Sequence, residues 1–281
     1  MMNYAQAFEH YQQKIAIIGE ESEALAFVFK EQKGWSTLDY LLAQNQAISE
    51  SDLVLLEAIY SQLVSHKPAQ YILGYALFCD MTLNVDERVL IPRPETEELV
   101  ELILTENPDT ACRVLDIGTG SGAIALALKK GRPNWQVTAS DLSQAALDVA
   151  QQNAKALALD VSFVLSDVFS AVQGPFDIIV SNPPYIAESD KGEVGGNVLT
   201  SEPHSALFAQ EDGYAIYRQI IEQASSYLTA KGKLYFEIGY KQGQGLAEMV
   251  RKHLPKARVR VIQDMFGKDR MVAVDDVSIE D

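Results

Sequence analysis

Cysteine and histidine are scarce in this chain. Its 281 residues include two cysteines, Cys79 and Cys112, and four scattered histidines. Two isolated cysteines give no disulfide framework and lack the paired spacing of a zinc site. No histidine forms a ligand cluster with either of them. We therefore predict no metal centre and expect a reduced protein of the cytoplasm.

Long apolar runs and an excess of basic residues are also lacking. The longest runs, such as "IALAL" at 124–128, are far shorter than the roughly 20 residues of a membrane span. The first residues show no basic region followed by an apolar one, as a secretory signal would. Lysine and arginine number 23 against 39 aspartates and glutamates, for a net charge of −16. Because phosphate contacts dominate nucleic-acid affinity, this balance argues against direct nucleic-acid binding; we also expect no membrane association.

The spacing of apolar residues divides the chain into three parts. Up to residue 74 they recur every three or four positions, as in "SDLVLLEAIYSQLV", where Ser51 is a possible helix cap. Residues 75–92 look extended, and we expect a β-hairpin linker there with a turn at Asp86 and Glu87. A helix follows in "RPETEELVELIL", with Pro94 in its first turn and Thr96 as a possible cap. The predicted domains are a helical domain (1–74), the linker (75–92) and a larger domain (93–281).

Strands and helices alternate from about residue 112. Strands are expected at 112–118, 135–141, 161–167, 176–182 and 232–239, mostly separated by helical segments. This alternation predicts an α/β fold with a mostly parallel sheet and helices on both faces. The last two strands, 257–263 and 269–275, have no helix between them, which indicates an antiparallel hairpin at one edge.

A glycine-rich turn follows the first of these strands. In "VLDIGTGSGAIAL", the strand ends at Asp116, and Gly118, Gly120 and Gly122 precede a helix. Glycines permit a positive φ and a close approach of a ligand to the backbone. Gly118, Gly120 and Ala123 also fit the dinucleotide-binding pattern G-x-G-x-x-G/A, which has an acid about 20 residues later. Asp141 supplies that acid in either case, and we expect it to accept hydrogen bonds from ribose hydroxyls.

The fourth strand ends in "SNPPYI". Pro183 and Pro184 have fixed φ angles and no N–H groups, so their carbonyls point in set directions. Asn182 adds a side-chain carbonyl, and Tyr185 adds an aromatic face. Together these groups form a slot for a planar NH₂ group. The lone pair of an amide nitrogen is delocalised. When both of its N–H groups donate hydrogen bonds to acceptors, electron density returns to the nitrogen. The same hydrogen bonds stabilise the positive charge that develops on methylation.

The run "DIGTGSG" resembles motif I of S-adenosylmethionine-dependent methyltransferases, whose class I fold has a seven-stranded sheet with a reversed edge hairpin. That resemblance implies S-adenosylmethionine as the cofactor and S-adenosylhomocysteine as the product. Asp141 would hold the ribose, and Asp167 and Val168 would lie by the adenine, with Asn182 facing the methyl donor. The complete set of cofactor-binding residues expected is Asp116, Gly118, Thr119, Gly120, Ser121, Gly122, Asp141, Asp167, Val168 and Asn182.

Further motifs narrow the resemblance. "PAQYILG" (68–74), "LIPRPETEELV" (90–100), "SNPPYI", "EPHSALF" (202–208), "FEIGYKQG" (236–243) and "DRMV" occur in the order found in the bacterial HemK/PrmC family of peptide chain release factor glutamine methyltransferases. The resemblance implies methylation of the amide nitrogen N5 of the glutamine in the GGQ motif of class 1 release factors. The helical domain would help to bind the factor. Asn182, Pro183, Pro184 and Tyr185 would bind the target glutamine and form the catalytic site.

Some assignments stay open in the sequence. Arg93, Glu95 and Thr96 would lie near the active site, without individual roles. Val168 stands where the family often has a larger side chain, so the wall beside the adenine can differ here. Glycines in the segment 187–208 suggest a mobile lid over the substrate. An adenine-N6 nucleic-acid methyltransferase shares the slot chemistry and is the alternative enzyme. A cofactor-binding scaffold without turnover would not need that slot.

Overall fold

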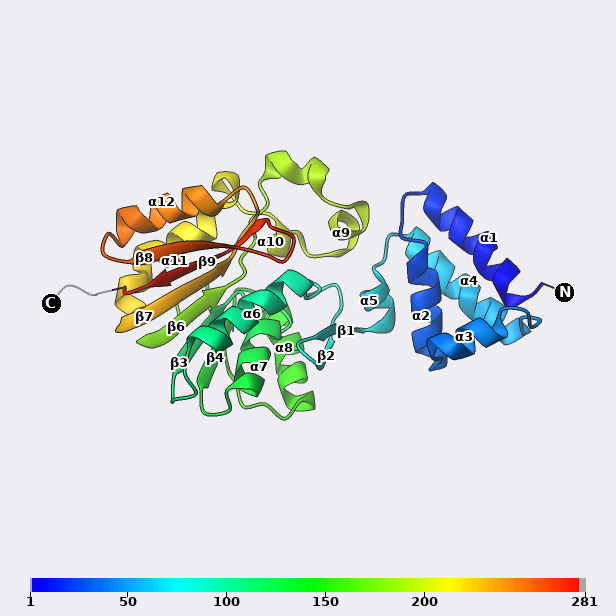
Figure 1. The fold of residues 1–281 in the computed structure, drawn as a ribbon, viewed down its shortest axis with the longest axis horizontal. Coiled ribbons are helices and arrows are strands. Elements are labelled where there is room, and N and C mark those ends of the chain that lie inside the picture. The colour runs from blue at the N-terminus through cyan, green and yellow to red at the C-terminus, as the bar shows by residue number, and fades with distance from the viewer. Residues whose placement is uncertain (1, 278–281) are drawn as a thin grey trace. The chain divides into compact units, whose positions relative to one another are not determined.

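A computed structural model describes residues 2–277 of the chain (Figure 1). The chain forms two compact units. One comprises the chain up to Tyr75 together with Val194–Glu202, and the other comprises Ala76–Glu193 together with the chain from Pro203 onward. The sequence analysis divided the chain into consecutive segments and did not predict that residues 194–202 belong to the first unit. None of the helices in residues 2–277 has the length and apolar character that crossing a membrane requires.

The first unit consists mainly of helices. Its core is apolar and aromatic: Phe8 and Phe29 are fully buried and meet edge to face, with ring centroids 5.2 Å apart. The hydroxyl of Ser201 donates a hydrogen bond of 2.8 Å to the carbonyl of His66, which ties the returning segment to the helices. The helices are α1 (Tyr4–Ile17), α2 (Glu23–Lys33), α3 (Thr37–Ala43), α4 (Glu50–Val64), α5 (Ala69–Leu73) and α9 (Gly196–Ser201).

The second unit is built on a seven-stranded sheet with the order β5-β4-β3-β6-β7-β9-β8. The pairs from β5 through β7 are parallel, and β9 runs antiparallel to both of its neighbours, β7 and β8. The bounds are β3 (Arg113–Ile117), β4 (Gln136–Asp141), β5 (Ser162–Leu165), β6 (Phe176–Ser181), β7 (Leu228–Glu237), β8 (Arg258–Gln263) and β9 (Asp269–Asp275). The predicted fold class, a class I methyltransferase sheet with a small helical domain, is confirmed.

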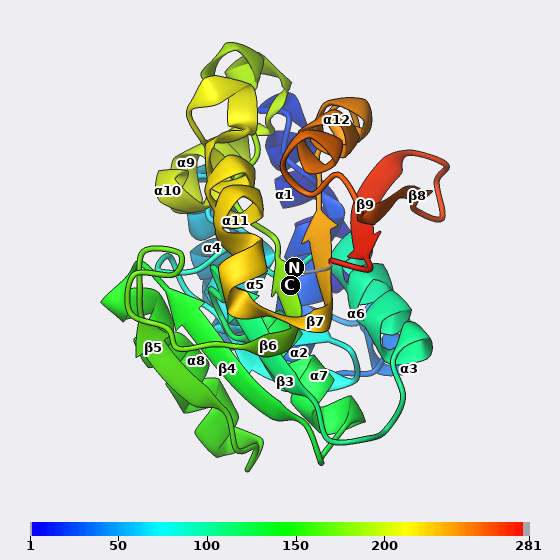
Figure 2. The same ribbon diagram turned by 90° about the vertical axis from the view of Figure 1, so that its left-hand side faces the viewer.

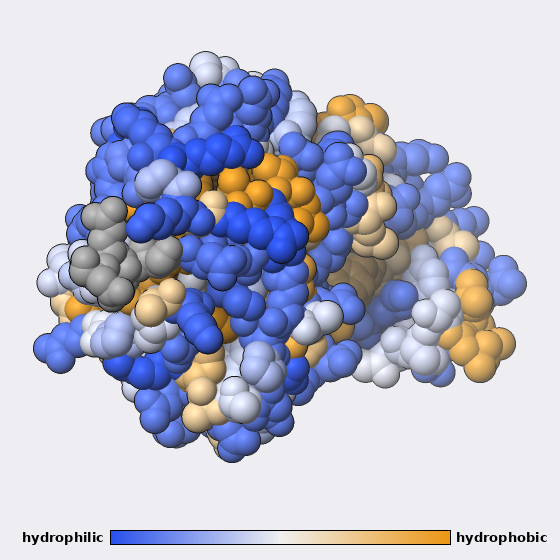
Figure 3. Space-filling model, turned by 60° about the vertical axis from the view of Figure 1, so that its left-hand side comes forward, coloured by the Kyte–Doolittle hydropathy of each residue, from blue (hydrophilic) through white to orange (hydrophobic). Residues whose placement is uncertain are grey.

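Successive residues of each strand point to opposite faces of this sheet, and both faces are covered. Val114 packs in the apolar layer that includes α6 and α7, whereas Leu115 packs in the layer that includes α11 and α12. Figure 2 shows α11 and α12 beside the strands. The helices of this unit are α6 (Pro94–Glu106), α7 (Ala123–Gly131), α8 (Gln144–Ala156), α10 (His204–Leu207), α11 (Ala215–Tyr227) and α12 (Gly243–His253), with 3₁₀ turns η1 (Glu188–Glu193) and η2 (Glu211–Gly213). The surface drawn in Figure 3 is mostly hydrophilic, with smaller hydrophobic areas.

A two-stranded hairpin, β1 (Tyr75–Phe78) and β2 (Met81–Asn84), precedes α6. Cys79 and Asp80 both have positive φ angles, as the two central residues of a type I′ turn do. The turn expected at Asp86 exists, because the N–H of Val89 donates to its carbonyl, but it lies beyond the hairpin.

Two helix caps differ from the sequence prediction. The side chain of Ser49, not Ser51, caps α4 by accepting a hydrogen bond from the N–H of Asp52. Helix α6 has Arg93 at its N-cap position and Pro94 at its first position, so Thr96 lies inside the helix and does not cap it. Because proline has no N–H to satisfy, it suits the first position and moves the start of the helix upstream. The hydroxyl of Thr96 is therefore available for another partner.

Candidate active site

Strand register brings three separate sequence segments to one edge of the sheet. Ile117 of β3 pairs with Ser181 of β6, and Ser181 in turn pairs with Phe236 of β7. The next residues along each strand are the glycine turn, Asn182 and Glu237. All three segments therefore follow the carboxyl ends of adjacent parallel strands, where open α/β sheets bind their ligands.

The three glycines of the turn differ in the space around them: one is closely packed, and the other two face open space. Gly118, Gly120 and Gly122 all have positive φ angles, between 55° and 85°. A Cβ atom on Gly122 would lie 3.0 Å from Leu126 and 3.2 Å from Ala150, so this glycine permits close packing. A Cβ on Gly118 or Gly120 would meet no heavy atom within 4 Å. The first two glycines thus expose backbone to open space, where a ligand can approach.

Asp116 lies beneath this turn and is fully buried. Its Oδ2 accepts hydrogen bonds from the hydroxyl of Thr119 at 2.6 Å and from the N–H of Ala125 at 3.2 Å. Its Oδ1 has no hydrogen-bond partner. Burial raises the pKa of the carboxyl group to about 7. A buried oxygen without a partner is costly, so this atom is suited to a donor that a ligand supplies.

Asp141 connects the glycine turn to the start of α8. Its Oδ2 accepts from the N–H of Gly120, and its Oδ1 accepts from the N–H of Ser143, both at 2.9 Å. Burial raises the pKa of its carboxyl group. Each carboxylate oxygen keeps a further lone pair for a hydroxyl donor. Leu142 follows with 70% of its side chain exposed, an apolar residue beside the turn that the sequence analysis did not select.

Asn153 is a further residue that sequence reasoning missed. It is fully buried, and its Nδ2 donates to the carbonyls of Asn84 at 3.0 Å and Ser121 at 2.9 Å. The N–H of Asn84 donates back to its Oδ1 at 2.7 Å. This amide therefore braces the glycine turn against the hairpin. An asparagine in the middle of a helical segment gives no sequence signal for such a contact.

The two residues expected beside an adenine ring have different surroundings. Asp167 is exposed, and its N–H donates to the hydroxyl of Ser170. Val168 is buried and packs in the apolar layer with Phe169. Its φ angle of 48° is unusual for a β-branched residue, and the hydroxyl of Ser166 donates to its carbonyl at 2.9 Å. Only Asp167 of this pair presents its side chain to the surface.

The Asn-Pro-Pro-Tyr segment is held firmly at the end of β6. Pro183 is buried, and Asn182, Pro184 and Tyr185 are partly exposed. The carbonyl of Tyr185 accepts from Nε2 of Gln242 at 3.1 Å, and it leaves no room for a Cβ on Gly213, which would lie 2.1 Å away. Burial raises the pKa of the Tyr185 hydroxyl to about 12, so it stays protonated.

A hydrogen-bonded chain links this segment to two other motifs. Nδ2 of Asn182 lies 3.4 Å from the hydroxyl oxygen of Thr96, and that hydroxyl donates to Oε2 of Glu237 at 2.6 Å. Thr96 belongs to "RPETE" and Glu237 to "FEIG". Of the other residues in "RPETE", Arg93 and Glu95 act electrostatically on Tyr185, Arg93 lowering the pKa of its hydroxyl and Glu95 raising it. The structure thus brings motifs from α6, β6 and β7 together.

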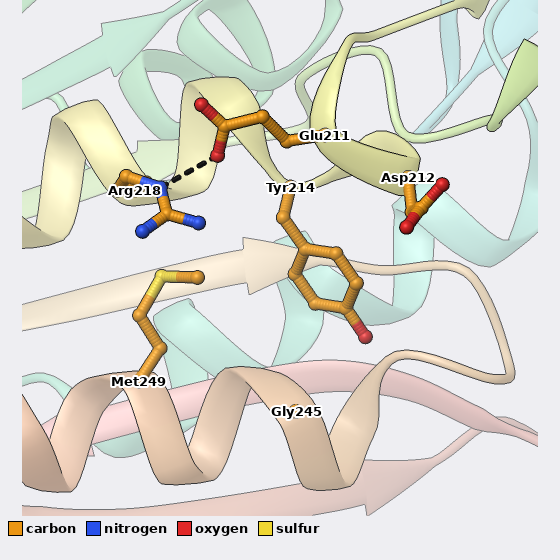
Figure 4. Close-up of a pocket in the computed structure, with 6 residues that line it drawn as sticks. All are labelled: Glu211, Asp212, Tyr214, Arg218, Gly245 and Met249. Atoms are coloured by element: carbon orange, nitrogen blue, oxygen red, sulfur yellow. Dashed lines mark hydrogen bonds and ion pairs between the residues drawn. The ribbon is translucent and has the colours of Figure 1, made fainter.

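A separate surface hollow lies between the start of α11 and α12 (Figure 4). Arg218 and Glu211 form an exposed ion pair on its rim, with the Nε–Oε2 distance 2.6 Å. Its lining residues are Glu211, Asp212, Tyr214, Arg218, Gly245 and Met249. None of them is a predicted site residue, so the candidate active site is the strand edge described above. Within residues 2–277 no group of three or more potential metal ligands is present.

Comparison with known proteins agrees with this arrangement. A model of the PrmC N-terminal domain matches residues 6–74, and a model of the methyltransferase small domain matches residues 95–209. The fold resembles that of a methyltransferase from Pyrococcus furiosus, with a TM-score of 0.55 and 20% identity over 80% of this chain and 98% of that one.

Two relatives are similar over almost their whole length. The release factor glutamine methyltransferase of Streptococcus pneumoniae is 58% identical over 98% of this chain and 99% of its own. The release factor glutamine methyltransferase of Bacteroides thetaiotaomicron is 46% identical over 90% of this chain and 92% of its own. Such identity, together with both matched domains, means that the chain belongs to the HemK/PrmC family of release factor glutamine methyltransferases.

Proposed function

We propose that this protein transfers a methyl group from S-adenosylmethionine to the side-chain amide nitrogen N5 of the glutamine in the GGQ motif of class 1 peptide chain release factors. The observation that carries the proposal is the position of Asn182-Pro183-Pro184-Tyr185 beside the glycine turn, on adjacent parallel strands. The target is a protein, and the reaction takes place in the cytoplasm.

The residues around the glycine turn suit the cofactor. Gly118 and Gly120 leave open space above the backbone, and Oδ1 of Asp116 is a buried acceptor without a partner. Asp141 keeps lone pairs for ribose hydroxyls, and the exposed carboxylate of Asp167 would lie at the adenine end. Thr119 and Ser121 are buried: Thr119 holds Asp116, and the Ser121 carbonyl is held by Asn153. When bound, S-adenosylmethionine supplies an electrophilic methyl group on a positive sulfur, which keeps the electron pair of the broken bond and leaves in S-adenosylhomocysteine.

The Asn182 segment suits the target nitrogen. Two carbonyl groups accept hydrogen bonds from the two N–H groups of the glutamine amide. One is the side-chain carbonyl of Asn182, and the other is the backbone carbonyl of one of the two prolines. These bonds increase electron density on nitrogen and stabilise its positive charge as the new bond forms. Tyr185 remains a neutral aromatic wall, since burial raises its pKa to about 12. The nitrogen then loses a proton to solvent, so no carboxylate base is needed before transfer.

The remaining parts have supporting roles. The helical unit binds the release factor outside its GGQ loop. The segment 187–208, which contains η1, α9 and α10, would become more ordered when substrate binds. Slower amide hydrogen exchange in this segment on addition of cofactor and substrate peptide is the expected result, and unchanged exchange would remove the lid from the proposal.

The test is methyl transfer from labelled S-adenosylmethionine to a purified class 1 release factor, with a variant lacking the GGQ glutamine as the matched control. Label on the wild-type factor alone supports the proposal. Label on nucleic acid with none on either factor would instead establish an adenine-N6 methyltransferase. Full cofactor affinity without transfer to any partner would indicate a scaffold.

A further inference from the structure

Thr96 and Glu237 form a buried pair behind the Asn182 amide. Thr96 lies in the first turn of α6, and Glu237 ends β7. Their exposed fractions are 4% and 2%. The Thr96 hydroxyl contacts both the Glu237 carboxylate, at 2.6 Å, and Nδ2 of Asn182, at 3.4 Å. The hydroxyl therefore links the carboxylate to the Asn182 amide, and this amide also hydrogen-bonds Glu237 directly.

The direction of these hydrogen bonds depends on the charge of Glu237. An ionised carboxylate only accepts, so the single proton of the Thr96 hydroxyl is donated to Glu237. The hydroxyl oxygen keeps lone pairs that accept from the NH₂ group of Asn182. The amide nitrogen is thereby turned toward Thr96, and the side-chain carbonyl is left for another donor. The opposite orientation would place an NH₂ group in the slot, where it would repel the N–H bonds of a bound amide.

We propose that Thr96 and Glu237 are positioning residues that fix which end of the Asn182 amide faces the substrate. The inference rests on the proposed function, because it concerns the polarity that methylation of an amide requires. It gives "RPETE" and "FEIG" a shared role, although neither residue touches the reacting atoms. Holding a catalytic group in one orientation is worth large factors in rate, since a displacement of about 1 Å can cost 10²-fold.

Other groups around Glu237 tune its charge. Arg270 on β9 favours the ionised form, whereas Glu95 on α6 disfavours it. Tyr185 and Tyr217 also face this carboxyl group electrostatically, and the Tyr217 hydroxyl donates to the backbone carbonyl of Glu237 at 2.6 Å. Burial is the largest influence and raises the pKa of Glu237 to about 7. A protonated Glu237 can donate to Thr96, which frees the hydroxyl proton and allows the amide to turn.

The first test compares Thr96→Val with Thr96→Ser. Valine keeps the shape of the side chain without the hydroxyl, and serine keeps the hydroxyl. We expect Thr96→Val to lower kcat on release factor about ten- to hundredfold, with cofactor affinity within about threefold of wild type. Thr96→Ser should restore kcat to within about threefold. A wild-type kcat in Thr96→Val would overturn the inference. Equal losses in both variants, accompanied by equal losses of thermal stability, would also overturn it by indicating a structural role.

The dependence of kcat on pH distinguishes a role of Thr96 in positioning Asn182 from a role in packing alone. With cofactor in excess, wild-type kcat should rise with pH as Glu237 ionises, by up to about tenfold per pH unit below its pKa. Thr96→Val should show a smaller rise than wild type, because the path through the Thr96 hydroxyl is lost and only the direct hydrogen bond between Asn182 and Glu237 remains. The same rise in Thr96→Val as in wild type would overturn the inference.

A measurement independent of turnover uses the side-chain NH₂ signals of Asn182 in ¹H–¹⁵N spectra, assigned with Asn182→Asp. These signals should shift or broaden in Thr96→Val and match wild type in Thr96→Ser. Wild-type signals in Thr96→Val would overturn the inference. If wild-type protein methylates no release factor, the proposed function fails, and the amide signals still decide whether Thr96 orients Asn182.

Discussion

Asp116, the residue before the end of β3, and Glu237, the last residue of β7, have closely similar surroundings. Both carboxyl groups are buried, and each accepts a hydrogen bond of 2.6 Å from a threonine hydroxyl, Thr119 in one case and Thr96 in the other. Burial raises the pKa of both to about 7. They differ in what lies beyond the pair. Oδ1 of Asp116 has no partner, whereas the hydroxyl beside Glu237 leads on to Asn182.

This difference suggests that one carboxyl group binds a ligand and that the other positions a neighbouring side chain. An unpartnered buried oxygen carries a desolvation cost of about 1–3 kcal/mol, which a ligand can remove by supplying a donor. On the proposed function, the cofactor would supply the missing donor at the Asp116 end. The Glu237 end is hydrogen-bonded within the protein, so we expect it to contribute orientation rather than affinity. Two similar carboxyl–threonine pairs at one sheet edge thus do different work, and substitutions should distinguish them.

The largest effect is expected from Asn182→Ala, which removes the group that Glu237 orients. Loss of one preorganised hydrogen bond to a developing charge costs about 10²–10³-fold in rate. We expect kcat for release factor methylation to fall by this factor, with cofactor affinity within a few fold of wild type. Isothermal titration with S-adenosylhomocysteine provides the control. A fall in affinity as large as the fall in rate would contradict the assignment of Asn182 to the substrate.

Asp116→Asn tests the binding end of the comparison. Hydrogen bonds to a charged group contribute about 1.5–3 kcal/mol, so cofactor affinity should fall roughly ten- to hundredfold. Glu237→Gln is the matched control, because it makes the same chemical change at the positioning end, and its cofactor affinity should stay within a few fold. Titration of both variants measures the contrast. Equal losses in the two would show that the pairs do not differ in role.

Asp141→Ala extends the test to the ribose site. We expect cofactor affinity to fall about tenfold, through loss of an acceptor and of the bonds that hold Gly120 and Ser143. Turnover at saturating cofactor should change little. Thermal unfolding of the free protein reports how much of the loss is structural. Unchanged affinity would mean that the ribose is held elsewhere.

The sequence allowed the meeting of two motifs at one sheet edge to be predicted, for identifiable reasons. Glycines with positive φ and paired prolines constrain the backbone locally, so the turn at Gly118 and the segment at Asn182 are visible without a structure. Strand periodicity then placed both at one sheet edge. The partnership of Thr96 with Glu237 was not predictable, because it joins residues 141 positions apart through tertiary packing. Thr96 was predicted as a possible helix cap, but Arg93 occupies the N-cap position of α6.

The packing of 194–202 against the helical unit was missed for the same kind of reason. Its bond from Ser201 to His66 spans 135 positions and has no local pattern. Asn153 is a third case, since its contacts with Asn84 and Ser121 depend on how α8 lies against the hairpin. Sequence patterns identified residues with an unusual backbone conformation. Side chains that contact residues distant in the sequence could be identified only from the three-dimensional structure.

The smallest expected effect is a change in how stability depends on pH. The folded-state pKa of Asp116, about 7, lies above its value in the unfolded chain, so the folded protein holds this proton more tightly. The contribution to stability is complete below about pH 4 and is lost as pH rises through about 7. Asp116→Asn removes the ionisation, so its free energy of unfolding should decline less than that of wild type between pH 6 and 8, by about 1 kcal/mol. Urea denaturation at the two pH values measures this difference. A decline equal to that of wild type would show that Asp116 is ionised throughout this range, and its free oxygen would then bind cofactor with the same strength at pH 6 as at pH 8.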